Sequence, residues 1–80
     1  MHDIPWSKPV RIQFSRSRMR VVDGPVAALE LLDREWPLRR GRHYDAAKAM
    51  CRAALARLTS PDAAREIFIS ASIEAAVPIR

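Results

Sequence analysis

Basic side chains are the residues of this sequence whose type and spacing could do chemistry. The chain has 80 residues, of which 14 are Lys or Arg and 9 are Asp or Glu, so that its net charge is +5. One basic group precedes a predicted helix and consists of Arg39, Arg40, Arg42 and His43. A second lies on one face of a predicted hairpin and consists of Arg11, Arg18 and Arg20. Guanidinium groups beside the amides of a helix N-terminus can bind an anion, and a two-stranded ribbon bearing Arg can enter a DNA groove.

Each basic group also has an interpretation that needs no ligand. The predicted helix over residues 25–36 is acidic, so the connector that follows it can simply balance that charge. Polar residues on one side of an antiparallel hairpin are the ordinary surface of a half-buried sheet. Binding of nucleic acid or another polyanion is therefore an alternative that the sequence leaves open.

Residues suited to catalysis or metal binding are few. The chain has two His and one Cys, with a spacing that fits no zinc-ligand pattern. His43 and Cys51 would lie roughly 12 Å apart along one helix, too far for a catalytic pair. Its two glycines, Gly24 and Gly41, are too distant in the chain to form one phosphate-binding loop. The sequence therefore predicts no enzyme, no metal site and no cofactor.

Two short segments alternate apolar and polar residues, which predicts a β-hairpin. They are residues 10–14 and 18–21, with three residues between them. Pairing Ser15 with Arg18 would gather the apolar side chains on one inner face, namely Ile12, Phe14, Met19 and Val21. The outer face would then carry Arg11, Gln13, Ser15, Arg18 and Arg20.

Helical periodicity follows the hairpin and predicts helices over residues 25–36, 44–58 and 61–76. Asp23 or Gly24 would cap the first helix, and Ser60 would cap the third, where Pro61 follows at the first helical position. The inward stripe of the second helix would contain Tyr44, Ala47, Cys51, Ala54, Leu55 and Leu58. The stripe of the third would contain Ala64, Phe68, Ala71 and Ala75. Cys51 is therefore expected to be a buried, unreactive thiol.

The ends of the chain are predicted to be extended. Residues 1–9 contain Pro5 and Pro9 and form an arm that Trp6 would fix to the body. Residues 77–80 could add a short edge strand. The apolar fraction of 49% excludes a disordered chain. We therefore expect a single α+β domain over residues 10–80, with a hairpin followed by three helices.

Ile69 and Ile73 lie one helical turn apart, outside the inward stripe of the third helix. Either the sheet and the second helix cover one side each, or a second copy of the chain covers this pair.

No apolar run is long enough for a membrane span, no signal peptide is recognisable, and the lone Cys fits a reducing interior, so we expect a cytoplasmic protein.

Several landmarks occur together in order: Trp6, Trp36-Pro37, Gly41, Tyr44, Ala47, Cys51, Phe68 and Glu74-Ala75. In these residues the chain resembles the small bacterial proteins of the domain of unknown function 982 family, from Trp6 to about Ala76. The resemblance supports the fold outline and implies no activity, cofactor or site. The favoured hypothesis is a non-enzymatic binding or adaptor module that self-associates, with an unknown protein partner and no membrane.

Overall fold

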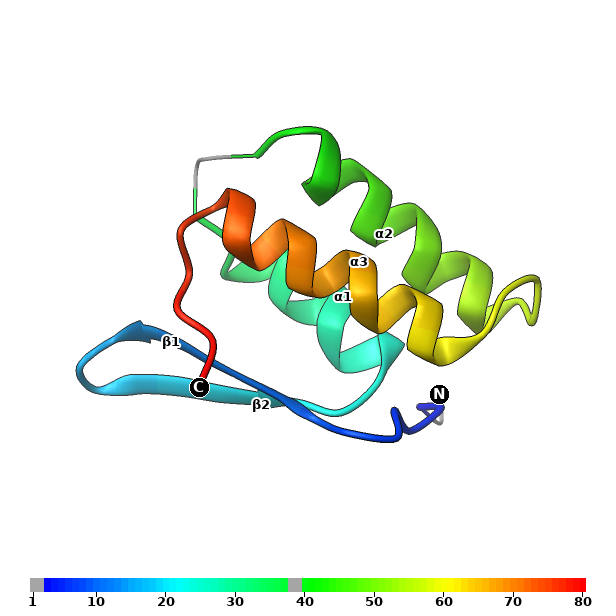
Figure 1. The fold of residues 1–80 in the computed structure, drawn as a ribbon, viewed down its shortest axis with the longest axis horizontal. Coiled ribbons are helices and arrows are strands. Elements are labelled where there is room, and N and C mark those ends of the chain that lie inside the picture. The colour runs from blue at the N-terminus through cyan, green and yellow to red at the C-terminus, as the bar shows by residue number, and fades with distance from the viewer. Residues whose placement is uncertain (1–2, 38–39) are drawn as a thin grey trace.

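A computed structural model describes residues 3–37 and 40–80 of the chain. An antiparallel hairpin is followed by three helices, which confirms the expected α+β fold. The elements are β1 (Val10–Ser15), β2 (Arg18–Val22), α1 (Pro25–Arg34), α2 (Arg42–Leu55) and α3 (Pro61–Glu74). The helices lie on one side of the hairpin, with α3 between the hairpin and α2 (Figure 1). The second face of the hairpin is therefore left without a helical cover.

Three aromatic rings form the centre of the core. Phe68 is fully buried on α3, and its ring lies 5.7 Å from that of Trp6 and 5.6 Å from that of Trp36. Trp6 fixes the N-terminal arm as expected, because its ring is buried and its backbone N–H donates to the Asp23 carbonyl at 2.7 Å. The predicted inward stripe of α3 is confirmed, since its other members, Ala64, Ala71 and Ala75, are also buried.

The register of the hairpin differs from the prediction by one residue. Ser15 pairs with Arg18 as expected, but an irregularity between Gln13 and Ser15 leaves Phe14 unpaired, so that Ile12 faces Arg20 instead of Val21. A shift of one residue moves every side chain of a strand to the other face. The expected inner face is therefore wrong for β2: Met19 and Val21 are 48% and 56% exposed. Phe14 itself packs edge-on against the ring of Trp36 at 6.1 Å, a long-range contact that the local alternation could not reveal.

The second helix begins earlier and ends earlier than predicted. It closes at Leu55, because Arg57 adopts a left-handed conformation with φ of 61°. Leu58, expected on the inward stripe, therefore follows the helix and is 80% exposed. Residues Tyr44, Ala47, Cys51 and Ala54 of that stripe are buried as expected.

Ala76 ends α3 in the same way, with φ of 57°. Its N–H donates to the Ile73 carbonyl and that of Val77 to the Ser72 carbonyl, both within 3.0 Å. Glycine adopts this conformation without steric cost, whereas other residues are strained there. We expect Ala76→Gly to raise the free energy of unfolding by about 0.5–1 kcal/mol in urea denaturation. Ala75→Gly, one residue earlier at φ of −84°, should lower it, and a loss of stability in both variants would contradict this account of the helix end.

The C-terminal tail lies beside β1 and not beside β2. Ile79 forms an isolated antiparallel bridge with Ile12. Gln13 donates its backbone N–H to the Pro78 carbonyl at 3.0 Å, and Arg80 donates to the Arg11 carbonyl at 2.7 Å. The edge strand suggested by the sequence is thus a single bridge. Since β1 has a neighbour on both sides, the outer edge of β2 is the open edge of this sheet within the described residues.

Candidate functional site

The backbone groups of Met19 and Val21 point toward the open edge of β2. Residues along a strand present their N–H and C=O groups alternately to the two neighbouring strands. On β1, Arg11 and Gln13 bond to the C-terminal tail, so Val10 and Ile12 bond to β2 through their partners Val22 and Arg20. Met19 and Val21, which pair with Gln13 and Arg11, therefore direct their N–H and C=O groups away from the sheet.

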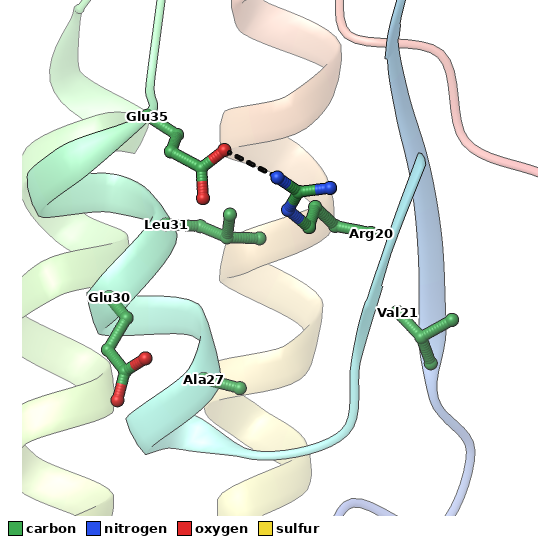
Figure 2. A pocket seen from close by; sticks show the side chains of 6 residues that line it. All are labelled: Arg20, Val21, Ala27, Glu30, Leu31 and Glu35. Carbon is green, nitrogen blue, oxygen red and sulfur yellow. Dashed lines mark hydrogen bonds and ion pairs between the residues drawn. The ribbon is translucent and has the colours of Figure 1, made fainter. Parts of the chain in front are cut away.

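A groove of about 200 Å³ lies between this edge and α1, and we call it the open-edge groove. Its lining comprises Arg20, Val21, Ala27, Glu30, Leu31 and Glu35. Figure 2 shows Arg20 extending from β2 across the groove to Glu35, above Leu31, while Val21 points away from α1. Leu31 is buried and contributes to an apolar floor. The groove therefore combines apolar surface with two carboxylates.

The two carboxylates of the open-edge groove differ in their ion pairing. Glu35 accepts hydrogen bonds from Arg18 and, at 3.2 Å, from Arg20. Partial burial opposes ionisation of Glu35, but its hydrogen bonds and the charges of both guanidinium groups outweigh this, and its pKa lies below the ordinary value. Glu30 is exposed and has no ion-pair partner among the described residues. It is the carboxylate that a basic group entering the groove would meet.

The predicted basic face of the hairpin is divided between the two sides of the sheet. Arg18 and Arg20 lie on the side of the helices, where Glu35 balances their charge, whereas Arg11, opposite Val21, lies on the outer side. The expectation of a continuous basic ribbon is therefore wrong, because the register shift moved the two residues of β2. Nucleic-acid binding by this face stays a prediction, but the three arginines do not lie on one side of the sheet as that hypothesis expected.

The basic connector before α2 differs from expectation in another way. Arg39 lies outside the described residues, and Arg42 is exposed. The guanidinium of Arg40 lies over the ring of Tyr44, 5.0 Å from its centre. The helix N-terminus was expected to offer free amides to an anion, but the carboxylate of Glu74 on α3 occupies it.

Glu74 accepts hydrogen bonds from the backbone N–H groups of Gly41, His43 and Tyr44 at 3.0–3.1 Å. The Nδ1 atom of His43 lies 3.2 Å from the same carboxylate. The hydrogen bond from His43 is the largest influence on Glu74, and together with the other amides it holds the pKa of this carboxyl below its ordinary value despite some desolvation. The contacts of the Glu74 carboxylate are therefore explained by its role in stabilising the start of α2.

Asp3 caps α1 in the same manner, from the N-terminal arm. Its carboxylate accepts from the N–H groups of Val26 and Ala27 at 2.9 and 3.1 Å. A glycine is the N-cap residue of each of these helices, and a Cβ atom on Gly24 or Gly41 would lie only 2.5–2.6 Å from the capping carboxylate. Glycine at a helix start with no capping side chain of its own was the sequence signal for these distant caps.

We expect no measurable salt-sensitive binding of this chain to a random DNA duplex at physiological salt. Affinity for DNA depends on the number of phosphates that basic groups neutralise, and Glu35 already engages Arg18 and Arg20. Fluorescence anisotropy at two salt concentrations measures this directly. Binding that weakens with salt, and whose salt dependence falls in Arg11→Ala or Arg42→Ala, would restore the nucleic-acid hypothesis.

Cys51 is fully buried, as the sequence predicted, and desolvation, with a smaller contribution from Asp3, raises its pKa to about 12. The thiolate, which is the reactive form, is therefore scarce at neutral pH.

Within residues 3–37 and 40–80, no cluster of three His, Cys, Asp or Glu could hold a metal ion. In the same ranges, no helix has the length and apolar character needed to cross a membrane.

The two isoleucines predicted for self-association lie in different environments. Ile69 is partly buried and packs against the core, so the domain itself covers it. Ile73 is 69% exposed and borders a second hollow, of about 450 Å³, together with His43, Ser70 and Glu74. Their role in self-association stays a prediction.

Residues 8–79 match the model of a family described as "Protein of unknown function (DUF982)". This match confirms the resemblance inferred from the residues. The NMR structure of Agrobacterium tumefaciens protein Atu1219 is similar to this chain, with 35% sequence identity and a TM-score of 0.78. The similarity covers 92% of this chain and 74% of that one. No curated protein matches the sequence.

Proposed function

Because the chain belongs to the DUF982 family, whose description assigns no activity, we propose a function from the geometry of its own surface. The protein is a non-enzymatic binding module that takes up an extended segment of a second polypeptide chain at the edge of β2. The observation that carries this proposal is the open edge at Met19 and Val21 beside the open-edge groove.

An added strand is the natural ligand for such an edge. Unpaired N–H and C=O groups on an edge strand are a template for pairing, and main-chain hydrogen bonds supply affinity while side-chain pockets supply specificity. Alternate side chains of the incoming segment would point to opposite faces of the enlarged sheet. Those on the helix side would enter the open-edge groove, and those on the other side would lie beside Met19 and Val21.

The surroundings of the edge specify the chemistry of the incoming segment. Glu30, which has no ion-pair partner among the described residues, favours a basic side chain on the helix side, and the apolar surface of Met19 and Val21 favours apolar side chains on the outer side. The preferred ligand therefore alternates basic and apolar residues. A segment with acidic residues at the inward positions would meet Glu30 and be repelled.

Two features of the described residues support a role without catalysis. The pKa of Cys51 is raised to about 12, which suppresses its nucleophilic form. Two carboxylates with the densest polar contacts, Asp3 and Glu74, accept hydrogen bonds from helix amides and thereby serve stability.

Titration of the isotope-labelled chain with a short capped peptide of alternating Arg and Val tests the proposal by NMR. We expect the amide signals of Met19 and Val21 to shift and their hydrogen exchange to slow. A peptide of alternating Glu and Val is the control and should bind at least about tenfold more weakly.

Val21→Pro removes the N–H group that the added strand needs, at an edge position where proline is tolerated. Val21→Thr keeps this N–H group and is the matched control. Binding should be lost in the first variant and kept in the second. Equal binding by both variants, or signal changes confined to another surface, would overturn the proposed function.

A further inference from the structure

The sequence of β2 has the alternation that its own open-edge groove selects. From Arg18 to Val21 the strand reads basic, apolar, basic, apolar. Arg18 and Arg20 pair with Glu35 on the helix side, while Met19 and Val21 are exposed on the outer side. Resting on the function proposed above, we infer that the segment taken up is β2 of a second copy of this chain.

An antiparallel β2–β2 pair about a two-fold axis at Arg20 satisfies the open edge of both copies. This register places Met19 opposite Val21 of the second copy, and Val21 opposite its Met19. Both residues direct their N–H and C=O groups outward from the hairpin, so each pair can exchange two main-chain hydrogen bonds. The Met19 carbonyl accepts from the exposed Arg20 guanidinium at 3.2 Å in the single chain, and the main-chain bond would replace this side-chain bond. A two-fold axis at Val21 would instead place Met19 opposite Asp23, whose carbonyl already accepts from Trp6 at 2.7 Å.

The same register buries the apolar surface that β2 exposes. Met19 and Val21 are about half exposed on the outer side of the hairpin. Side chains that lie directly opposite one another on an antiparallel pair are in contact distance. Each Met19 would pack against Val21 of the other copy, which gives these exposed residues a partner.

Charge complementarity favours a second copy over an unrelated apolar strand. The two-fold axis brings Arg20 of each copy into the open-edge groove of the other, where Glu30 has no ion-pair partner among the described residues. Like charges face each other at the two Arg20 residues, but Glu30 and Glu35 of both copies surround them. The paired grooves then hold four Arg and four Glu side chains in total, two of each from every copy: Arg18, Arg20, Glu30 and Glu35.

Sedimentation equilibrium over a range of concentrations tests this dimer. Wild-type protein should pass from monomer to dimer as its concentration rises. Val21→Pro should raise the dissociation constant at least about tenfold, the effect of losing about 1.4 kcal/mol, whereas Val21→Thr should change it little. Thermal unfolding of each variant verifies that the monomer is folded.

A charge exchange provides an independent test. Glu30→Arg alone should weaken the dimer, because it places positive charge beside Arg20 of the other copy. Arg20→Glu alone should also weaken it, with two carboxylates brought together. An equimolar mixture of the two variants should form a mixed dimer. Arg20 of the Glu30→Arg copy keeps its contact with Glu30 of the other copy, and the second contact is restored with its charges exchanged.

Several outcomes would overturn the inference. They are a wild-type protein that stays monomeric, a dimer that Val21→Pro leaves unchanged, and a mixture of the charge variants that does not associate. A monomeric protein that nevertheless binds the Arg–Val peptide at β2 would refute the second copy as ligand but uphold the proposed function. Failure of both the peptide and the dimer at β2 would refute the function itself.

Discussion

Phe68→Ala should lower the free energy of unfolding by about 3–5 kcal/mol, which is a large part of the stability of a small domain. Phe68 is fully buried, and its ring lies between those of Trp6 and Trp36. Truncation would remove the contacts that join the N-terminal arm and the end of α1 to α3. Urea denaturation monitored by tryptophan fluorescence measures the loss.

Ile73→Ala is the matched control for this prediction, because Ile73 lies on the same helix but is 69% exposed. Its stability should stay within about 0.5 kcal/mol of the wild type. Similar losses in the two variants would mean that Phe68 is not the centre of the core. A change of mass in Ile73→Ala would instead support the self-association surface predicted from the sequence.

Glu74→Gln should lower the melting temperature by several degrees. The carboxylate accepts from three backbone N–H groups at the start of α2, and an amide presents an NH₂ donor to some of these donors. The variant keeps the size of the side chain, so the loss reports the charge and the hydrogen bonds. Glu66→Gln, at an exposed position of the same helix, is the control and should unfold near the wild-type temperature.

The effect of Glu74 should depend on pH in a defined direction. Its pKa is lowered in the folded protein, with the hydrogen bond from the His43 backbone as the largest cause. The stabilisation is therefore complete above the unfolded pKa of about 4.3 and is lost as the pH falls through the lower folded value. The difference in melting temperature between wild type and Glu74→Gln should shrink as the pH falls through the folded pKa of Glu74. A difference that persists unchanged below this pKa would contradict the cap.

Gly41→Ala tests whether the missing Cβ atom makes room for this cap. The added Cβ would lie 2.6 Å from a Glu74 oxygen, so the variant should unfold at a lower temperature than the wild type. In the background of Glu74→Ala the same change should cost less, because the crowded group is gone. Equal costs in the two backgrounds would show that the two residues act independently.

Local signals in the sequence determined the order of the elements and the inward faces of α2 and α3. Ser60 accepts from the Ala63 N–H at 3.0 Å, so its predicted role as the cap of α3 is confirmed. The burial of Phe68 and Cys51 follows from helical spacing alone. These features were predictable because capping and periodicity act over one or two turns of helix, where sequence neighbours are spatial neighbours.

Only the tertiary structure decided the register of the hairpin, the caps of two helices and the open edge of β2. Phe14 leaves the ladder and packs on Trp36, and the accompanying register shift reverses the faces of Arg18 and Arg20. Glu74 reaches Gly41 across the fold, and the C-terminal tail selects β1 as its neighbour, which leaves Met19 and Val21 at the edge. Each of these contacts joins segments far apart in the chain. Their stability comes from packing and hydrogen bonds that exist only after the chain has closed on itself, so local patterns of residues do not specify which distant segments meet.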